Sequence, residues 1–520
     1  MEAERPGTDL VRVRTGVYHD SVSLMRVSRA AAALPGVEVA VVAMATGLNL
    51  GIAAELGFEL PAAGPADLLV AVRAADGDAA ERAAAEVDGL LAALAARTGG
   101  AAGAEEPART VRAAVRAAGG AAGGAATLAL VSVPGPYAFA EAMDAVEAGL
   151  SVMVFSDNVP VEQEVLLKRR AAERGVLVMG PDCGTAVVGG TGLGFANVLR
   201  PGPVGIVAAS GTGAQQVACL LDLAGVGVSH VLGVGGRDLS AEVGGLSTLR
   251  ALEALDADPA TELIVLVSKP PDAEVADAVR KAAGRLATPV ATAFPGRSSG
   301  RGPDDLTSAT EDVLRALGVK VPEWPSWPAA GPHAPGAGDA ARSGPVPDGG
   351  AAGTPARPVP DGGASGASAG AADGGAADGR ARALHGIYSG GTLCTEAALV
   401  AGTGGFTDYG DDAYTRGRAH PMIDPALRLE ALAAVPSGDA VLLDVVLGHG
   451  ADPDPAGRLA PAVAAAVARG VSVTVALVGS EGDPQGLAAQ AGALCAAGAD
   501  VFASNALAAR HAARLTGGAR

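Results

Sequence analysis

Two short turns made of glycine and hydroxyl residues have the composition of an anion-binding site. Each turn follows an apolar run and precedes an Ala-rich run of helical character. At a helix start the backbone N–H groups point outward at the positive end of the helix dipole, and glycines let a phosphate reach them. The candidate phosphate-binding residues are Ser210, Gly211, Thr212 and Gly213 in the first turn and Ser389, Gly390, Gly391 and Thr392 in the second.

The presence of this turn twice in one chain favours a shared site. If both helix starts point at one place, a single phosphoryl group is held from two sides. The alternative is that these are two unrelated helices, each capped by its own hydroxyl residue.

Three further turns that follow apolar runs carry amide or charged side chains. Asn158 and Asp182 offer hydrogen-bonding groups to an amide ligand, and Arg237 offers a cation to a carboxylate or phosphate. Capping of the next helix is the alternative role for Asn158 and Asp182. We take these three residues as candidate catalytic residues, because open parallel sheets bind ligands where strands end.

His420 is the fourth candidate catalytic residue. It lies in a polar loop that also carries Arg416 and Arg418 and has proline at positions 421 and 425. Such a histidine can act as an acid or base or position an anionic substrate, and a structural loop histidine is the alternative. The histidines show none of the spacings of metal ligands, so the sequence predicts no metal site.

Apolar runs alternate with helical runs on both sides of a central low-complexity segment, which indicates an α/β fold. The runs are nearly continuous, as expected for strands of parallel sheets that are buried on both faces. The predicted strands are Val37–Met44, Leu68–Val72, Leu128–Val133, Val152–Phe155, Val176–Met179, Val204–Ala208, His230–Gly233, Leu263–Val267, Val290–Ala293, Ala440–Val446, Val471–Val478 and Val501–Ser504. The predicted helices include Tyr137–Ala148, Val161–Arg174, Ala214–Ala224 and Asp272–Arg285.

Residues 325–380 are predicted to be a flexible linker. They consist mainly of Ala, Gly, Pro, Ser and Asp, and the hexapeptide PVPDGG occurs in them twice. The linker separates a large amino-terminal part from a carboxy-terminal α/β domain at 381–520.

Charge and cysteine content exclude several classes of partner and site. The formal net charge of −18 disfavours binding to nucleic acid or to an anionic membrane surface. No apolar run is long enough to span a membrane and the first residues lack the features of a signal peptide, so we expect a cytoplasmic protein. The four cysteines are far apart, which predicts small buried thiols and no zinc site or disulfide framework.

Four motifs, in their order and spacing, resemble the alpha subunit of succinyl-CoA synthetase: Pro134–Tyr137, Gly180–Gly184, Gly205–Thr212 and Asp258–Glu262. The carboxy-terminal domain resembles the CoA-ligase domain of the beta subunit of the same enzyme. A second set of motifs resembles the FdrA family more closely: Ser156–Pro160, Met179–Thr185, Gly194–Val198, Gly235–Ser240, Tyr388–Cys394 and His420–Pro425. This resemblance covers nearly everything outside the linker.

The resemblance implies a Rossmann-like, CoA-binding-type domain at 1–200 and flavodoxin-like ligase domains at 201–324 and 381–520, all with parallel sheets. In succinyl-CoA synthetase two helices, one from each subunit, aim their amino termini at a phosphohistidine. By similarity, these are the helices that begin at Ser210–Thr212 and Ser389–Thr392.

The chain departs from that enzyme in the parts that carry the phosphate and CoA. Where a Gly-His-Ala-Gly-Ala loop should hold the phosphohistidine, Phe294–Gly300 reads FPGRSSG. The Gly-rich CoA fingerprint is replaced by Thr15–Ser21, and no stretch resembles an ATP-grasp domain. These losses favour a phosphoryl group that arrives or leaves on a small acyl phosphate and is never attached to the protein.

The FdrA resemblance implies an oxamate carbamoyltransferase that acts with partner subunits in purine and allantoin nitrogen catabolism. Oxalurate and phosphate would be converted to oxamate and carbamoyl phosphate. The helix ends would stabilise charge on the phosphate, while Asp182, Asn158 and either Arg237 or Arg418 orient the amide and carboxylate of the substrate.

Two alternatives remain open. One is an NDP-forming acyl-CoA synthetase that uses His420 as carrier and takes its nucleotide site from a partner; only then would CoA and ATP or ADP be needed. The other is a non-catalytic phosphate-binding regulatory protein. In the leading interpretation no cofactor is attached covalently, and phosphate or carbamoyl phosphate is a substrate.

Overall fold

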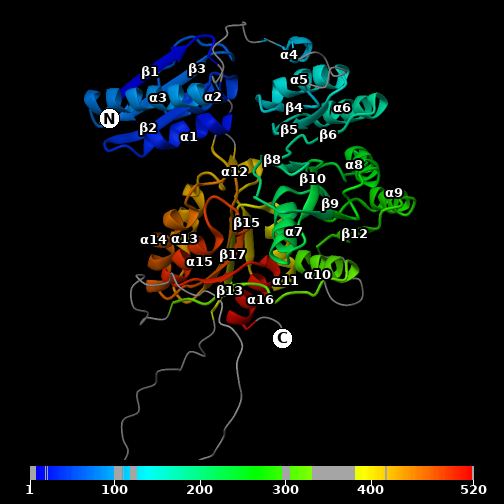
Figure 1. Cartoon of the computed structure of the whole chain (residues 1–520). Helices are drawn as coiled ribbons and strands as arrows, with labels where there is room; N and C mark the ends of the chain where they lie inside the picture. The colour runs from blue at the N-terminus through cyan, green and yellow to red at the C-terminus, as the bar shows by residue number, and fades with distance from the viewer. Residues whose placement is uncertain are drawn as a thin grey trace, which may run out of the picture.

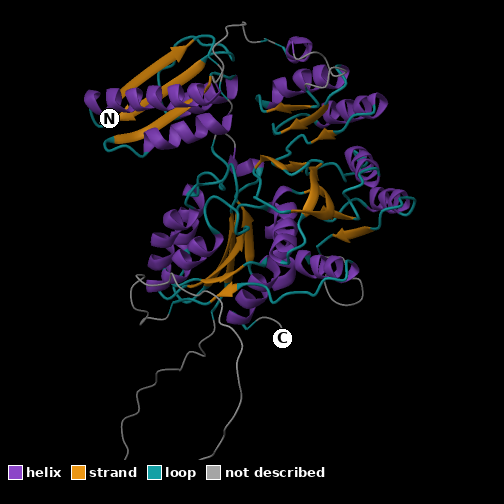
Figure 2. Ribbon diagram, viewed as in Figure 1, coloured by secondary structure: helices purple, strands orange, loops and turns teal. Residues whose placement is uncertain are grey.

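The computed structural model describes residues 7–17, 19, 21–98, 108, 110–117, 126–295, 305–330, 381–415 and 418–517. Within these residues the chain forms four sheets, and helices cover them (Figures 1 and 2). The two three-stranded sheets come first in the chain and the two six-stranded sheets follow. Most strand pairs are parallel, so the predicted α/β class is confirmed.

The first sheet is antiparallel, which corrects the parallel sheet predicted for Val37–Met44 and Leu68–Val72. Its strands are β1 (Thr8–Arg14), β2 (Val37–Met44) and β3 (Leu68–Ala74), and its helices are α1 (Ser21–Ala32), α2 (Gly47–Glu55) and α3 (Gly77–Thr98). Strand β3 inserts between β1 and β2, as in a split βαβ unit. Helices α1 and α3 cover one face of β3 and α2 covers the other. The continuous apolar run of β3 therefore reflects burial of both faces of the strand and does not indicate whether its neighbours are parallel.

The second sheet is parallel and small. It consists of β4 (Leu128–Val131), β5 (Ser151–Val154) and β6 (Val178–Met179), connected by α5 (Gly135–Glu147) and α6 (Val161–Arg174), and α4 (Val111–Ala117) packs on α5. The residues predicted as one Rossmann-like domain at 1–200 thus contain two separate sheets in their described part, and their last two strands, Thr185–Val188 and Thr191–Gly194, belong to a third sheet. Figure 1 shows these two units above the two larger sheets.

The third sheet has flavodoxin-like strand order. Its parallel strands are β9 (Pro201–Ala209), β10 (Val228–Gly233), β11 (Leu263–Ser268) and β12 (Val290–Ala293). They lie in the order β10–β9–β11–β12, and the antiparallel hairpin of β7 (Thr185–Val188) and β8 (Thr191–Gly194) extends the β10 edge. Its helices are α7 (Gly211–Leu223), α8 (Leu246–Asp256), α9 (Ala273–Ala283) and α10 (Leu306–Ala316). The strand order reverses between β9 and β11, where such sheets bind ligands.

The fourth sheet repeats this plan. Its strands lie in the order β15–β14–β16–β17–β18, with the antiparallel strand β13 at the far edge. They are β13 (Ser326–Trp327), β14 (Leu384–Tyr388), β15 (Gly405–Asp408), β16 (Ala440–Val446), β17 (Ser472–Val478) and β18 (Asp500–Phe502). The helices are α11 (Gly391–Ala401), α12 (Asp412–Thr415), α13 (Ala426–Ala434), α14 (Pro455–Ala468), α15 (Leu487–Ala496) and α16 (Asn505–Leu515). The order is the 2-1-3-4-5 order of flavodoxin-like sheets, as predicted.

One hydrophobic core joins the third and fourth sheets. It includes buried residues from α7, α11 and α16, so the two domains pack as one body. A buried polar network crosses this core. Asn505 accepts a hydrogen bond from Tyr388 Oη at 2.9 Å and donates to Glu396 at 2.7 Å, and its backbone N–H donates to Gln216.

Several smaller predictions can also be compared with the structure. All four cysteines are buried free thiols, as predicted. Among the described residues no helix has the length and apolar composition needed to cross a bilayer. The predicted linker, 325–380, lies outside the described residues from position 331 onward. Near its start Ser326–Trp327 form β13, which pairs with β18, so the prediction of a flexible segment is wrong for these two residues.

The Asn505 network gives a test of the shared core. Asn505→Leu leaves the Tyr388 hydroxyl and Glu396 Oε2 without their buried hydrogen-bond partner, so we expect the free energy of unfolding to fall by about 3 kcal/mol. Gln163→Leu is the control, because Gln163 Oε1 is buried without a hydrogen-bond partner among the described residues. Urea unfolding of both variants measures the difference, and an equal loss in both would contradict the role of Asn505.

Candidate functional site

The starts of helices α7 and α11 lie directly against each other. A methyl group built on Gly390 would lie 2.5 Å from Thr212 Oγ1, and one built on Gly213 would lie 3.1 Å from Thr392 Cγ2. Glycine at both positions therefore allows the two helix starts to touch. The two turns that the sequence suggested as parts of one site are brought together by the fold.

The paired helix starts present unused hydrogen-bond donors. The Ser210 side chain caps α7 by accepting from Gly213 N at 3.0 Å. The N–H groups of Gly211, Thr212 and Gly391 have no acceptor among the residues that the structure describes. These donors and the two dipole ends suit an oxyanion.

Ser389 is turned into the protein, where it supports the turn. Its N–H and Oγ both donate to Asp444 Oδ1, at 2.7 and 3.0 Å. Arg428 lies 3.1 Å from the same oxygen, and both charged groups are buried. Burial raises the pKa of Asp444, and the Arg428 guanidinium opposes this rise. Because the Ser389 donors are occupied, its predicted contact with phosphate has no free donor in this arrangement.

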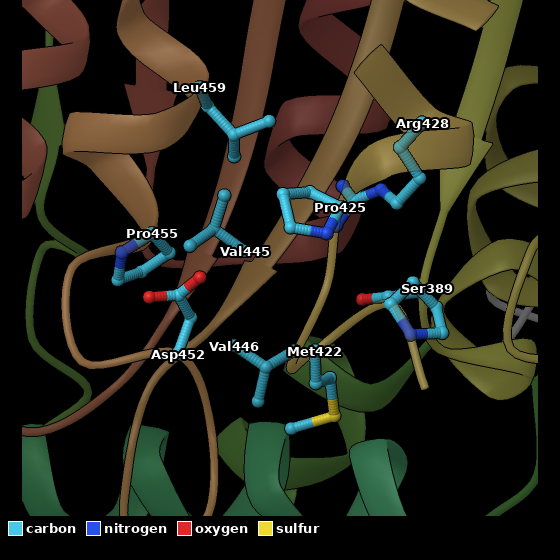
Figure 3. Close-up of a pocket in the computed structure, with 10 residues that line it drawn as sticks. Ser389, Met422, Pro425, Arg428, Val445, Val446, Asp452, Pro455 and Leu459 are labelled. Carbon is cyan, nitrogen blue, oxygen red and sulfur yellow. The ribbon is translucent and has the colours of Figure 1, made fainter. Parts of the chain in front are cut away.

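A small cavity lies behind this turn, between Ser389, Arg428 and Asp452 (Figure 3). Its volume is about 20 Å³, room for roughly one water molecule. The cavity is thus too small for a substrate.

His420 lies beside the start of α11. A methyl group built on Gly410 would lie 2.8 Å from His420 Nε2 and would also touch the Ser389 carbonyl oxygen. His420 Nδ1 accepts a hydrogen bond from Met422 N at 3.2 Å, which assigns the ring proton to Nε2. Burial, followed by the charge of Arg428, lowers the pKa of His420 to about 4. The ring is therefore neutral at pH 7.

Asp182 and Asn158 lie on two turns that touch. Both residues have left-handed backbone conformations, with φ of 57° for Asp182 and 52° for Asn158. Asp182 N donates to Ser156 O at 2.9 Å, which joins the two turns. Both side chains are exposed. Non-glycine residues seldom adopt this conformation, and where they do it is often at functional sites.

The Arg237 side chain is held by two contacts with the protein. Its guanidinium donates to Val159 O at 2.7 Å and pairs with Glu164 at 2.9 Å. Glu164 also binds Lys168, which in turn binds Asp238, all buried. Arg237 thus fastens its turn to α6, while remaining close enough to lower the pKa of Asp182.

Sequence reasoning missed two residues that lie against the start of α11. A methyl group on Gly391 would lie 2.5 Å from Asp408 Oδ2 and 2.8 Å from Lys269 Nζ. Lys269 lies two positions after the strand predicted at Leu263–Val267 and directly after the observed β11. The rule that ligands lie at strand ends would have found it, had it been applied to every predicted strand.

Two further carboxyl groups at this site have raised pKa values. Burial, followed by the nearby Asp157 charge, raises the pKa of Asp182 to about 7, although its side chain remains accessible to solvent. Burial raises the pKa of Asp408 to about 6, while a hydrogen bond from Gly410 N opposes the shift. Both groups can therefore accept or release a proton near neutral pH.

Two family models match the chain. One is described as "AllF, heavy metal-associated domain" and matches residues 8–108, and the other is "CoA-ligase" and matches residues 387–515. The first covers the antiparallel unit and the second covers most of the fourth sheet and its helices.

Curated relatives include one full-length match and several partial ones. An uncharacterized protein of Escherichia coli (strain K12), YahF, is 34% identical over 95% of this chain and 96% of its own length. Succinate–CoA ligase (ADP-forming) subunit alpha 2 of Archaeoglobus fulgidus is 34% identical over 28% of this chain and 50% of its own. Malate–CoA ligase subunit alpha of Methylorubrum extorquens is 27% identical over 38% and 72%. The predicted resemblance to succinyl-CoA synthetase is confirmed.

Two solved structures have weak overall similarity. ATP citrate lyase from Methanothrix soehngenii, in complex with citrate and coenzyme A, has a TM-score of 0.29 with 18% identity over 41% of this chain and 38% of its own. A dinucleotide-forming acetyl-coenzyme A synthetase from Ca. Korarchaeum cryptofilum, in complex with phosphate and ADP, has a TM-score of 0.26 with 16% identity over 75% and 82%.

The residues of the first unit do not fit a heavy metal ion. Soft metals are held by cysteine thiolates, and the first cysteine of the chain is Cys183, beyond residues 8–108. In the described part of the chain no group of three His, Cys, Asp or Glu side chains is placed to bind a metal. We therefore assign no metal to this unit.

The raised pKa of Asp182 predicts a pH-dependent cost in stability. The pKa of Asp182 is higher in the folded protein than in the unfolded chain. Its contribution to the stability of the folded protein is therefore fully present below about pH 4 and is lost as the pH rises through about 7. Asp182→Asn should therefore raise the melting temperature relative to wild type more at pH 8 than at pH 5. The exposed Asp277 provides the control, Asp277→Asn. Equal shifts at both pH values for Asp182→Asn would contradict the raised pKa.

Proposed function

Because the chain belongs to the family of the Escherichia coli protein YahF and contains a CoA-ligase domain, we propose that it transfers an acyl group to and from phosphate. Most concretely, the group is carbamoyl, and the reaction interconverts oxalurate and phosphate with oxamate and carbamoyl phosphate. The observation that carries the proposal is the pair of abutting helix starts, whose N–H groups at Gly211, Thr212 and Gly391 have no acceptor in the described part of the chain. The FdrA name stays a prediction from the motifs.

The chemistry suits a site that binds an oxyanion and moves one proton. An oxygen of hydrogen phosphate attacks the ureido carbonyl carbon of oxalurate, and the bond from that carbon to the oxamate nitrogen breaks. The proton lost by phosphate is gained by the leaving nitrogen, so charge and atoms balance. Asp182, with a pKa of about 7, can hold this proton between the two steps. The helix starts would stabilise the phosphate charge.

Carboxylates on the neighbouring turns suit the amide groups of these substrates. Oxamate and carbamoyl phosphate both carry NH₂ groups, which donate hydrogen bonds, and Asp157 and Asp182 offer acceptors on adjoining turns. Arg237 is fastened to Glu164, so its part in this proposal is to position the turn beside Asp182.

The state of His420 disfavours a covalent phosphohistidine. A phosphoryl acceptor needs a nitrogen with a free lone pair. His420 Nδ1 already accepts from Met422 N, and Nε2 carries the proton. A neutral imidazole with Nε2–H can instead donate a hydrogen bond to substrate.

A second candidate is an NDP-forming acyl-CoA ligase. The match to the CoA-ligase family and the place of His420 beside the α11 start favour it. The chain spans about half the length of the Archaeoglobus relative, and this candidate needs CoA and a nucleotide site from a partner chain. His420 would then be the phosphoryl carrier after release of its Met422 hydrogen bond.

The deciding experiment measures phosphate release by the protein co-purified with the subunits that it binds in its own cells. One sample receives carbamoyl phosphate and oxamate, and a parallel sample receives succinate, CoA and ATP. We expect release that requires both carbamoyl phosphate and oxamate and that continues in His420→Gln. Release that requires CoA and ATP, with loss of activity in His420→Gln, would favour the ligase. Binding of phosphate without turnover in either sample would favour a regulatory protein.

Gly211→Val tests the paired helix starts directly. Apart from the chain neighbours and the helix backbone, Thr185 is the only described residue within 4 Å of a methyl group at Gly211, so the fold should tolerate the change while the larger side chain blocks the N–H groups. We expect phosphate affinity to fall by more than about tenfold in titration calorimetry, equal to about 1.4 kcal/mol of binding free energy.

The matched control is Gly77→Val, at the first residue of α3, where a methyl group would meet nothing within 4 Å. Unchanged phosphate affinity in Gly211→Val, with both variants folded by circular dichroism, would refute the role of the paired helix starts.

A further inference from the structure

Lys269 lies at the point where the strand order of the third sheet reverses. It directly follows β11, whose last residue, Ser268, pairs with Ala209 of β9. Ser210, the cap of α7, follows Ala209 in the same way. Lys269 and the start of α7 therefore leave neighbouring strands at the same edge of the sheet. This is the place where doubly wound sheets bind ligands.

The Lys269 side chain reaches the other domain. Its Nζ lies 2.8 Å, and its Cε 3.3 Å, from the position that a methyl group on Gly391 would occupy. Gly391 is the first residue of α11. The ammonium group from the third sheet is thus placed at the helix start of the fourth sheet, and it has this access because residue 391 is glycine.

This placement is electrostatically unfavourable unless an anion is also present. The start of a helix carries a partial positive charge, which repels a cation placed beside it. Lys269 forms no ion pair with any residue that the structure describes, and its side chain is exposed. Asp408 faces it across Gly391 without closing an ion pair.

The charge of Lys269 also affects two carboxyl groups of the candidate site, Asp182 and Asp408. Its charge lowers the pKa of Asp182 on the turn after β6 and of Asp408 after β15, opposing the rise that burial causes in each. Its Nζ thus lies against the start of α11, and its charge acts on both carboxyl groups. Among the described residues of the site, Arg428 and Arg237 are engaged with Asp444 and Glu164.

We propose that Lys269 is a catalytic residue of this site that binds an oxygen of the phosphoryl group held between the starts of α7 and α11. This inference rests on the proposed function for the identity of the anion. A lysine ammonium is a compact point charge with three donors, which suits phosphoryl oxygens. A substrate carboxylate could also bind a lysine ammonium. Because the Lys269 ammonium lies against the helix starts, we assign the phosphoryl group to it as its ligand.

Lysine acetylation in the presence of ligands tests the proposal without requiring turnover. The full chain is treated with acetic anhydride, and peptide mass spectrometry measures the acetylation rates of Lys269, Lys281 and Lys320, all of which are exposed. We expect inorganic phosphate to slow acetylation of Lys269 by at least about fivefold, as a bound oxyanion occupies the ammonium, and to leave Lys281 and Lys320 unchanged. An unchanged rate at Lys269 would overturn the proposal. Protection by oxamate without protection by phosphate would also overturn it.

Substitution gives a second measurement. Lys269→Met should weaken phosphate binding in titration calorimetry by about tenfold or more, and Lys269→Arg should recover part of the affinity because the charge is kept. Lys320→Met is the matched control and should bind phosphate like wild type. Equal phosphate affinity in Lys269→Met and Lys320→Met would refute the role of Lys269.

These results separate the two proposals. Protection of Lys269 by phosphate in a protein that releases no phosphate from carbamoyl phosphate and oxamate would reject the carbamoyl transfer and keep the phosphoryl contact. Oxamate-dependent release that persists at the wild-type rate in Lys269→Met would keep the transfer and reject Lys269.

Discussion

The contact between the starts of α7 and α11 is the constraint on which the site depends. Each helix start carries roughly half a positive charge, so two of them placed together repel. The protein holds them together through the hydrophobic core shared by the third and fourth sheets and through the Asn505 network that crosses it. Glycine at 213 and 390 then removes the side chains that would separate the helices. The packing of the two domains against each other thus offsets the repulsion between the two helix starts and keeps a region of positive electrostatic potential between them.

Charged groups lie on two sides of the helix starts, one set buried beneath the turn and one on the exposed side, and they offset the positive potential. Beneath the turn, Asp444 accepts from Ser389 and pairs with Arg428, so the buried pair fixes the turn and adds little net charge. On the exposed side, Asp182 and Asp408 have pKa values raised to about 7 and 6. Carboxyls that are partly protonated repel an arriving phosphate less than ionised ones do. The same groups become better acceptors of a proton once an anion has bound and raised their pKa further.

Sequence patterns predicted the two larger domains well, because apolar strands followed by glycine-rich turns are local signals. The start of α7 at Ser210 and helix Val161–Arg174 agree with the structure. The sequence could not predict the relative direction of neighbouring strands or the long-range hydrogen-bond partners of side chains. The β3 strand is apolar throughout because helices cover both its faces, although its neighbours run antiparallel. Ser389 is of a residue type that often binds phosphate, but its N–H and hydroxyl both donate to Asp444, which is 55 positions away in the sequence.

The antiparallel first unit also contributes to the site, through contacts that no local pattern signals. Arg29 of α1 pairs with Asp452 at 3.0 Å and donates to Ile423 O, within the loop that begins at His420. Arg458 of α14 pairs with the same oxygen of Asp452, also at 3.0 Å. Two arginines from distant parts of the chain therefore share one carboxylate and hold the His420 loop against the start of α11. Because the Met422 N–H that fixes the His420 tautomer lies in this loop, the protonation state of the site depends on a contact made by the first unit.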